Sequence, residues 1–435
     1  MNSLKQAIFF CFLAAIGNIA GAQVLTLEEA INIALKKSLD IQIARNNLEA
    51  TGINNHISIA GGLPIFTGSI TDNQSITNLK QELTSGQKIE RKGNIQNQLN
   101  AGLSGNYTLF NGFRVIATKS RLAALEKQSE FLVSLQIQNI ISDVMVRYYD
   151  IVRQQGFMET IRQSIAVTRQ RKNLMDVRQS VGLANNADTY QAQLDLVASE
   201  QELRAQELVL SQSKADLMNL LAQRPDSVFV IRDTIIVDST IQMETVSSAI
   251  ANNPELRSAE EQIRITEFIA REVNAARFPA LGVSGGYNYS RSQSSAGFTL
   301  FNQNTGPFIG LNLQVPIFNG GANKRRHRIA EVDTRTATLQ RALVLNSLET
   351  LATRAYQAYV NTIERLRAEK QNNRIAAALL DVVTQRFQQG VGTVIDLREA
   401  QRSFVEAGYR LVELSFSAKV AEIELKRISS ELGRP

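Results

Sequence analysis

The sequence predicts an α+β membrane protein with a two-fold internal repeat, four transmembrane β-strands and two very long antiparallel coiled-coil helical hairpins. A glycine-containing turn motif occurs twice at a constant offset, which indicates a duplicated chain. Each turn follows about 70 residues with helical spacing of apolar side chains, and each helical stretch follows segments that alternate apolar with polar residues. Two helical hairpins of this length do not fit an ordinary globular domain.

The two copies keep their spacing around the turns. Gly182 and Gly390 lie 208 residues apart, and so do Asp188 and Asp396. The motif Phe-Asn-Gly, at 110–112 and at 318–320, keeps the same offset. We expect each turn glycine to end the outgoing helix with a positive φ, and each aspartate to cap the returning helix. A helix of 70 residues would be roughly 105 Å long.

The repeat defines the predicted domains. Residues 1–22 read as a signal peptide, because Lys5 precedes a short apolar run and small residues at 20–22 form a cleavage site. The first structural repeat covers 23–242, with a β-hairpin at about 64–110, a helical hairpin over 112–223 and an equatorial segment over 224–242 that holds a small strand. The second covers 243–435, with a β-hairpin at about 279–318 and a helical hairpin over 320–432. Seven additional residues in the first copy are assigned to a loop between strands.

Four segments show the alternation of β-strands, namely 99–109, 281–289, 309–317 and, less regularly, 65–76. In the first three, one face is apolar and the other is small or polar, as in a membrane strand that faces a watery lumen, whereas 65–76 has apolar residues on both faces. No charged residue occurs over 98–110 or 280–290, whereas a soluble sheet usually carries charge on its wet side. The pattern favours membrane strands over a soluble sandwich. The polar linkers 77–93 and 292–306 are expected to be loops.

The number of strands predicts an oligomer. Four strands cannot close a barrel, since even a filled barrel needs about eight. Open sheet edges are not tolerated in lipid. Several protomers must therefore contribute their strands to one wall.

Composition excludes several classes of protein. The net charge of +6 is spread along the chain and forms no basic stripe with interleaved aromatics, so nucleic-acid binding is not expected. The only cysteine, Cys11, lies in the predicted signal peptide, and only His56 and His327 could act as imidazole ligands or bases. No phosphate-binding glycine loop or metal-ligand spacing occurs. We expect no enzyme activity and no cofactor. No later stretch is long and apolar enough for a transmembrane helix.

Taken together, these motifs resemble the outer-membrane efflux protein family, the TolC-like outer-membrane factors of tripartite efflux and secretion systems. The resemblance covers the mature chain and rests on the two-fold repeat, the opening Asn-Pro-Glu-Leu at 253–256, the Phe-Asn-Gly junctions and the Gly-(x5)-Asp turns. It implies a homotrimer with a twelve-stranded barrel in the outer membrane and a periplasmic α-barrel of twelve helices. It also implies docking to a periplasmic adaptor (membrane fusion) protein that belongs to an inner-membrane transporter.

The two turns are candidate adaptor contacts. In the family, the hairpin turns at the periplasmic mouth meet the adaptor tip to tip. The corresponding residues here are Val181, Gly182, Leu183, Gly390, Val391, Gly392 and Thr393. A plain helical-hairpin turn would use the same residue types, so the adaptor role comes from the resemblance.

Acidic residues next to the turns are candidates for a pore-mouth ring. Asp396 and Glu399 lie three residues apart, so their carboxylates share a helix face. The resemblance implies that such acids make the narrow mouth prefer cations, and we include Asp188 of the first copy in the ring. The alternative is a helix cap with solvated acids in the first turn.

Two positions depart from the family pattern. A gating Tyr and Arg near the second turn correspond here to Phe387 and Gly392, so the family's hydrogen-bonded latch cannot form in the same way. A basic cluster, Lys324, Arg325, Arg326 and Arg328, follows the second Phe-Asn-Gly motif, where the chain should leave the membrane. Contact with anionic headgroups of the inner leaflet and a solvated helix cap are both compatible with that position.

These observations predict a passive exit duct in the outer membrane, with a large periplasmic extension, that conducts cargo delivered by an inner-membrane pump. The alternative is a periplasmic coiled-coil adaptor or scaffold with a soluble β domain. An adaptor would have one hairpin and charged strands, which differs from the pattern here. The cargo, whether drug, metal ion or protein, does not follow from the sequence.

Overall fold

The computed structural model describes residues 23–432, so the predicted signal peptide lies outside the described residues. Two compact units each draw segments from both halves of the sequence. We call Asn46–Leu132 with Glu255–Val344 the sheet unit. The described residues of Met1–Arg45, Val133–Pro254 and Leu345–Pro435 form the hairpin unit. The long helices α4 and α8 run through both.

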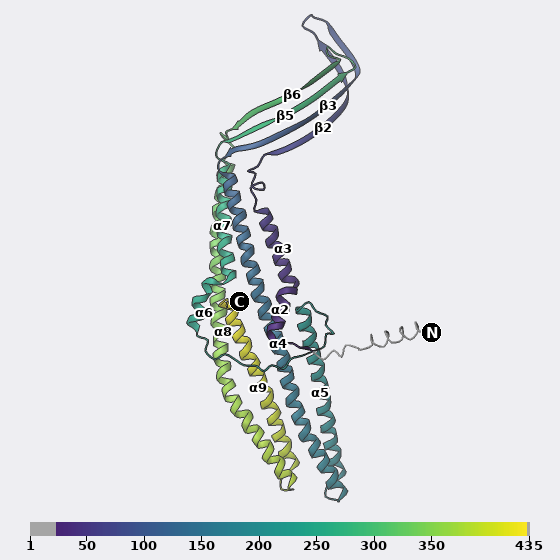
Figure 1. Cartoon of the computed structure of the whole chain (residues 1–435), viewed down its shortest axis with the longest axis vertical. Coiled ribbons are helices and arrows are strands. Elements are labelled where there is room, and N and C mark those ends of the chain that lie inside the picture. Colours follow the sequence, from purple (N-terminus) through teal and green to yellow (C-terminus); the bar gives the residue numbers. More distant parts are fainter. Residues whose placement is uncertain (1–22, 433–435) are drawn as a thin grey trace, which may run out of the picture. The chain divides into compact units, whose positions relative to one another are not determined.

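The sheet unit contains one antiparallel four-stranded sheet (Figure 1). Its spatial order is β2-β3-β5-β6, so the two β-hairpins lie side by side. The strands are β2 (Ile65–Glu82), β3 (Lys88–Asn111), β5 (Ala280–Ser294) and β6 (Phe301–Gln314).

The register gives this sheet one apolar face and one polar face. Leu103 pairs with Gly68 on one side and with Tyr287 on the other, and Tyr287 pairs with Pro307. Rows two residues away on the same face bring together Phe66, Gly105, Gly285 and Ile309, and Ile70, Ala101, Tyr289 and Thr305. Rows on the opposite face hold Thr71, Asn100, Ser290 and Asn304, and Thr67, Ser104, Gly286 and Phe308, so this face is polar apart from Phe308 in these rows. Alternation along each strand thus becomes a continuous apolar surface, because side chains of paired residues point the same way.

The strands are longer than the sequence indicated. β2 and β3 continue as a two-stranded ribbon through most of the predicted 77–93 loop, leaving only a short connection around Gly86. Cross-strand ion pairs explain the difference, since Lys80 Nζ lies 3.1 Å from Glu90 Oε1 and Lys88 Nζ lies 3.7 Å from Glu82 Oε2. Such charged pairs stabilise a ribbon although their residues read as loop. β5 and β6 likewise extend into the predicted 292–306 linker, whereas β6 ends at Gln314 rather than at 317.

Four long helices form two hairpins of equal dimensions. Helices α4 (Arg114–Ser180) and α8 (Ala322–Gln388) have 67 residues each, and α5 (Asn186–Leu220) and α9 (Val394–Ile428) have 35 each. At 1.5 Å per residue, the longer helices are roughly 100 Å long. The duplicated helical hairpins predicted from the repeat are therefore present, with ends within a few residues of those expected. Among the described residues, every helix is too short or too polar to cross a bilayer.

Shorter elements complete both units. Helix α2 (Leu27–Lys37) has a capping box at Thr26, and α3 (Leu39–Asn54) follows it after one residue. Helix α6 (Met243–Ala249), the 3-10 helix η1 (Ile250–Asn252) and α7 (Pro254–Ala275) form the opening of the second repeat. In the sheet unit, Arg121 of α4 forms a 2.6 Å ion pair with Glu272 of α7.

The equatorial segment is mostly irregular, which corrects the prediction of a strand over 228–237. Only β4 (Phe229–Val230) is extended, and it pairs in parallel with β1 (Gln23–Val24). Side-chain hydrogen bonds, rather than backbone hydrogen bonds between strands, hold most of this segment in place. The Tyr148 hydroxyl contacts the Leu25 carbonyl oxygen at 3.0 Å and the Asp233 carboxylate, and burial together with Asp233 raises the Tyr148 pKa. Tyr359 of α8 donates to the Asp238 carbonyl oxygen.

Candidate functional site

The two hairpin turns have the same backbone geometry. Gly182 has φ +76° and Gly390 has φ +80°, values in the left-handed region that glycine adopts without strain. The amide of Leu183 donates to the Arg178 carbonyl at 2.7 Å, and the amide of Val391 donates to the Arg386 carbonyl at 3.1 Å. These bonds satisfy carbonyls at the end of each outgoing helix, as in a Schellman cap.

The returning helices are capped one turn earlier than the sequence suggested. The N-cap residues are Asn185 and Thr393, and neither Asp188 nor Asp396 occupies that position. Asp396 is instead the third helical residue of a capping box. Its N–H donates to Thr393 Oγ1 at 3.1 Å, and its Oδ2 accepts from the Thr393 N–H at 3.2 Å. Asp396 thus stabilises α9 through the reciprocal bond of the box rather than as the cap itself.

Three acidic side chains lie exposed beside the turns. Asp188, Asp396 and Glu399 are all solvent-accessible in the single chain. Hydrogen bonds from Thr393, through its side chain and its backbone N–H, lower the pKa of Asp396 below its ordinary value. This carboxylate is therefore negatively charged at neutral pH. The arrangement permits an electrostatic ring only if several copies converge, so the ring stays a prediction.

Apolar side chains are exposed at both turns. Leu183 is 77% exposed, and Val181 and Val391 are also largely accessible. An isolated helical-hairpin turn would normally carry polar side chains at such positions, because exposed apolar groups are not stabilised by water. These residues form a small apolar contact surface at each hairpin end.

The structure explains both departures from the family pattern. Phe387 is only 2% exposed and belongs to a core cluster with Met175, Ala192, Leu380, Leu397 and Ala400, to which all four long helices contribute. A Cβ at Gly392 would lie 3.0 Å from the Phe387 backbone nitrogen and 3.2 Å from its Cα. A side chain at position 392 would therefore crowd the backbone of Phe387, and Phe387 is a packing residue.

A contact that sequence reasoning missed joins the two hairpins at this end. Arg178 Nη2 at the end of α4 donates to the Phe387 carbonyl oxygen at 2.9 Å, and its guanidinium lies 5.0 Å from the centre of the Phe387 ring. The hydrogen bond is charge-assisted, and the ring contact adds a cation–π attraction. Arg178 and Arg386 occupy equivalent positions in the repeat, so the sequence offered no signal as to which one makes the contact.

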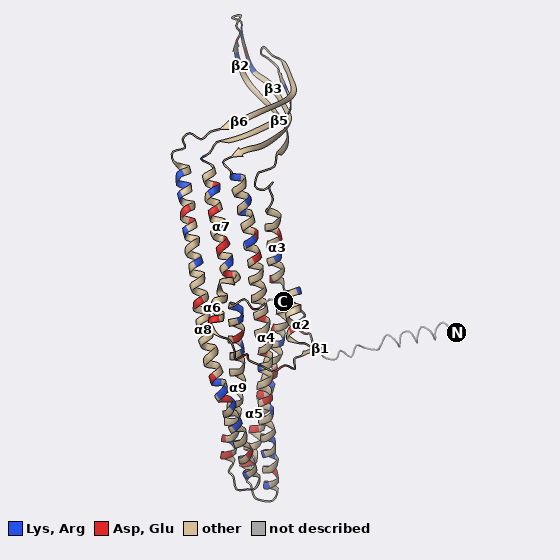
Figure 2. Ribbon diagram, turned by 60° about the vertical axis from the view of Figure 1, so that its left-hand side comes forward, with Lys and Arg blue, Asp and Glu red and all other residues tan. Residues whose placement is uncertain are grey.

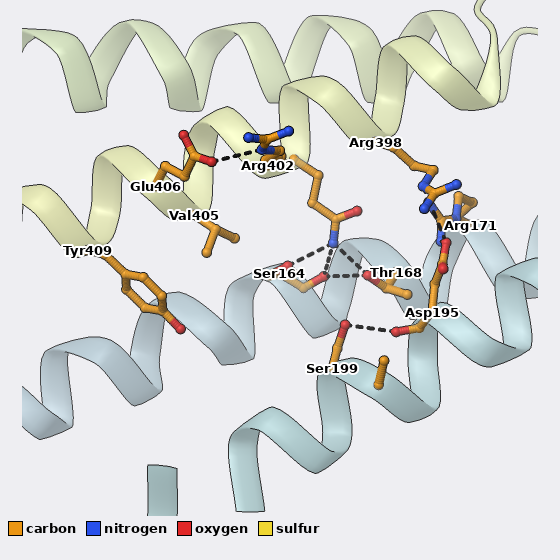
Figure 3. Close-up of a pocket in the computed structure, with 12 residues that line it drawn as sticks. Ser164, Thr168, Arg171, Asp195, Ser199, Arg398, Arg402, Val405, Glu406 and Tyr409 are labelled. Atoms are coloured by element: carbon orange, nitrogen blue, oxygen red, sulfur yellow. Dashed lines mark hydrogen bonds and ion pairs between the residues drawn. The ribbon is translucent and has the colours of Figure 1, made fainter. Parts of the chain in front are cut away.

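A polar cluster lies between the hairpins, away from the turns (Figure 3). Gln401 of α9 is buried, and its Nε2 lies 2.9 Å from the Ser164 carbonyl oxygen and 2.7 Å from Ser164 Oγ. Its repeat-equivalent, Gln193, is exposed. The cluster borders a cavity of about 410 Å³ between α4, α5 and α9.

An ion cluster borders the same cavity. The nearly inaccessible guanidinium of Arg171 contacts the Asp195 carboxylate, and Arg398 Nε lies 3.6 Å from Asp195 Oδ2. Burial lowers the pKa of Arg171, while the neighbouring Asp195 acts in the opposite direction. Polar contacts therefore replace apolar packing along this part of the seam. The spacing of apolar residues gave no indication of them.

The predicted basic cluster begins α8. Lys324, Arg325, Arg326 and Arg328 are exposed and lie within the first two turns of α8. Figure 2 shows basic residues in blue at the end of α8 that follows the sheet. Over residues 23–432, no three His, Cys, Asp or Glu side chains come together as metal ligands would.

Comparisons with known proteins agree with this architecture. Residues 30–223 and 245–430 match the family model described as outer membrane efflux protein. The chain is 23% identical to the outer membrane protein TolC of Vibrio cholerae over 384 residues, covering 85% of this chain and 86% of that protein. It is 22% identical to the toxin and drug export protein A of Aggregatibacter actinomycetemcomitans over 407 residues, covering 89% of this chain and 84% of the relative.

Solved structures share the fold. The outer membrane protein VceC of Vibrio cholerae superposes with a TM-score of 0.76 at 18% identity, covering 93% of this chain and 95% of that one. The outer-membrane channel OprN superposes with a TM-score of 0.75 at 16% identity, covering 93% of this chain and 89% of that one.

Proposed function

Because the chain belongs to the outer membrane efflux protein family, we propose that it is the passive outer-membrane exit duct of a tripartite efflux or type I secretion system. In this role it conducts cargo and catalyses no reaction. The observation that carries the proposal is a sheet with one apolar and one polar face, connected to two helical hairpins of equal size.

The sheet has the dimensions of a membrane wall. The apolar row of β5 runs from Leu281 to Tyr289, roughly 26 Å along the strand. Outer-membrane barrels carry an apolar band about 25 Å tall on the lipid side and polar residues inside. The apolar row of this sheet would face lipid, and the row with Asn100, Ser290 and Asn304 would face water.

The outer strands of the sheet require partners. Within the described chain, β2 and β6 each pair on one side only. Unpaired backbone groups are strongly disfavoured in hydrocarbon. We infer that β6 of one protomer pairs with β2 of the next, and that three protomers close a twelve-stranded barrel above a periplasmic α-barrel.

Each hairpin turn is the inferred contact for a periplasmic adaptor. Exposed Val181, Leu183 and Val391 provide an apolar surface for a partner. Next to them, exposed Asp188, Asp396 and Glu399 would form a negatively charged ring when three copies surround one axis. The partner's inner-membrane transporter would supply the energy, since a duct of this kind has no site for nucleotide or cofactor.

The proposal is tested with the full chain purified from outer membranes in detergent. We expect a trimeric mass by light scattering, and ion-conducting pores after reconstitution into planar bilayers. A monomer that stays dissolved without detergent would refute the duct and favour the soluble adaptor. Deletion of the gene, followed by complementation with the wild-type chain, should abolish and restore resistance or secretion that depends on the cognate pump.

A further inference from the structure

We propose that the junction between the sheet and the helices is a binding surface for anionic phospholipid headgroups. This inference rests on the proposed function, because it places the helical end of the sheet at the periplasmic leaflet of the outer membrane. The surface lies entirely within the sheet unit and consists of cations beside exposed aromatic and aliphatic side chains.

The cations gather at the starts of two helices and in the connection after a third. Lys324, Arg325, Arg326 and Arg328 begin α8, Arg114 begins α4, and Arg277 follows α7; all six side chains are exposed. Over residues 23–432, the salt bridges leave these six cations without a carboxylate partner. Arg325 Nη2 donates to the Gly320 carbonyl oxygen at 2.6 Å, and Arg277 Nη1 donates to the Asn274 side-chain oxygen at 3.3 Å.

This placement is unfavourable for the isolated helices. The N-terminus of a helix carries partial positive charge, so acidic residues are stabilising there and basic residues are not. Helices α5 and α9 follow the rule with Asp188 and Asp396 in their first turns. Helices α4 and α8, which leave the sheet, have no acidic residue in the first turn. Cations retained against the helix dipole indicate that an external anion neutralises them.

Exposed apolar side chains identify that anion as part of a lipid. Phe318 is 87% and Ile317 is 94% exposed, and Phe113 and Phe278 are exposed as well. Phe113 adopts φ +65°, which is strained for a residue with a side chain, and its ring packs edge-on against Phe110 at 5.3 Å. A free phosphate would gain nothing from these rings, whereas the glycerol and upper acyl chains of a phospholipid would cover them.

A small cavity lies in the same surface. It has a volume of about 220 Å³ and is lined by the polar Asn111, Arg114 and Gln314 together with the apolar Phe278 and Pro316. A phosphodiester has negative charge that can pair with the Arg114 guanidinium and oxygens that can accept hydrogen bonds from Asn111 and Gln314. The first methylenes of the acyl chains would contact Phe278 and Pro316. We assign the headgroup of an anionic phospholipid, of the phosphatidylglycerol type, to this cavity and the adjacent cluster.

The test measures lipid retention by the full-length trimer. Protein is equilibrated in micelles with equal amounts of phosphatidylcholine and phosphatidylglycerol, and retained lipids are identified by native mass spectrometry. We compare wild type with the variant Lys324→Gln, Arg325→Gln, Arg326→Gln, Arg328→Gln. The control variant Arg354→Gln, Arg367→Gln, Lys370→Gln, Arg374→Gln removes the same charge from exposed positions further along α8.

Wild type and control should retain phosphatidylglycerol in preference to phosphatidylcholine. In the junction variant, the ratio of retained phosphatidylglycerol to phosphatidylcholine should fall at least about ten-fold. Each cation near an anionic surface strengthens binding by about five-fold. Equal preference in junction and wild-type proteins, or an equal loss in the control, would overturn the proposal. So would displacement of the lipid by soluble glycerol 3-phosphate at matched concentration, which would indicate a free-anion site.

A measurement on the wild-type protein tests the proposal even if the junction variant does not assemble into a trimer. Added NaCl should reduce the preference for phosphatidylglycerol, because screening weakens exposed charge interactions. A preference that salt leaves unchanged would contradict the proposal.

Conductance in pure phosphatidylcholine bilayers separates this inference from the proposed function. Pores without a lipid preference would refute only the lipid surface, and absence of pores would refute the duct.

Discussion

Gly408 of α9 faces Thr160 of α4 so closely that a Cβ on the glycine would lie 2.7 Å from Thr160 Cγ2. Four residues along each helix, Gly156 of α4 faces Val412 of α9, where an added Cβ would lie 3.0 Å from both Val412 methyls. Glycine on alternate sides of the contact lets the two helix backbones approach each other. The hairpins are thus joined by close backbone packing as well as by side chains.

The first prediction concerns this close approach. Gly408→Val should lower the stability of the hairpin unit by about 1–3 kcal/mol, because the added atoms overpack the contact with Thr160. The measurement is the midpoint of thermal unfolding followed by circular dichroism of the purified trimer. Ala368→Val, at an exposed position of α8, is the control and should leave the midpoint nearly unchanged. Adding Thr160→Ala should recover part of the loss, and a midpoint that does not move in the single variant would contradict the packing.

Buried Gln401 provides the second prediction. Gln401→Leu leaves Ser164 and Thr168 without the donor that lies between them, so we expect a loss of about 1–3 kcal/mol. The matched control is Gln193→Leu, at the equivalent but exposed position of the first repeat. Chemical denaturation of both variants in the same detergent makes the comparison. Equal stability of the two variants would mean that the polar cluster does not stabilise the seam.

The difference between Gln401 and Gln193 shows how far sequence reasoning reached. The repeat, the helix ends and the alternation of four strands follow from local signals in the sequence. At the helix ends, Gly182 and Gly390 each follow a long helical pattern and precede a capping residue. The buried state of Gln401 depends instead on which neighbouring helix it meets. Both copies present the same residue at the same offset, so only tertiary packing distinguishes them.

The ends of the strands and the caps illustrate a second limit. Residues 77–82 and 88–93 contain charges that are typical of loops, yet pairing of Lys80 with Glu90 extends the ribbon. At the turn, Asp396 was expected as the cap, but Thr393 begins the capping box and Asp396 completes it. The loop prediction for 77–93 was therefore wrong over most of its length, whereas Asp396 does take part in the cap, though not as the N-cap residue. In both cases the outcome depends on which residues pair, and spacing alone does not define those pairs.

The third prediction follows from the lowered pKa of Asp396. A carboxyl whose pKa is lower in the folded than in the unfolded protein contributes stability above its unfolded pKa, and this contribution is lost as pH falls through the folded pKa. The capping box should therefore stay intact at neutral pH and weaken only below about pH 4. If Asp396 belongs to a ring at the mouth, its contribution to cation preference should be present at neutral pH and be lost only below about pH 4.

Reversal potentials across planar bilayers in a KCl gradient measure that preference. Asp188→Asn with Asp396→Asn and Glu399→Gln should abolish it at pH 7, while single-channel insertion continues. Glu364→Gln with Glu349→Gln, which removes exposed acids of α8 away from the turns, serves as the control. A neutralised mouth that remains cation-selective would exclude the ring.

The last prediction concerns the adaptor contact at the turns. Leu183→Arg with Val391→Arg replaces exposed apolar side chains by charged ones, and neither side chain supports the core. We expect trimer formation and bilayer conductance to be retained, whereas pump-dependent export in cells should fall by at least about ten-fold, as for loss of an interface anchor. Leu208→Arg, at an exposed position of α5 distant in sequence from the turn, is the control and should preserve export. Cross-linking of the adaptor to a cysteine at position 183 gives a direct measurement, because it should require the assembled trimer. Full export by the double variant would show that the turns only reverse the chain, and that the adaptor binds elsewhere.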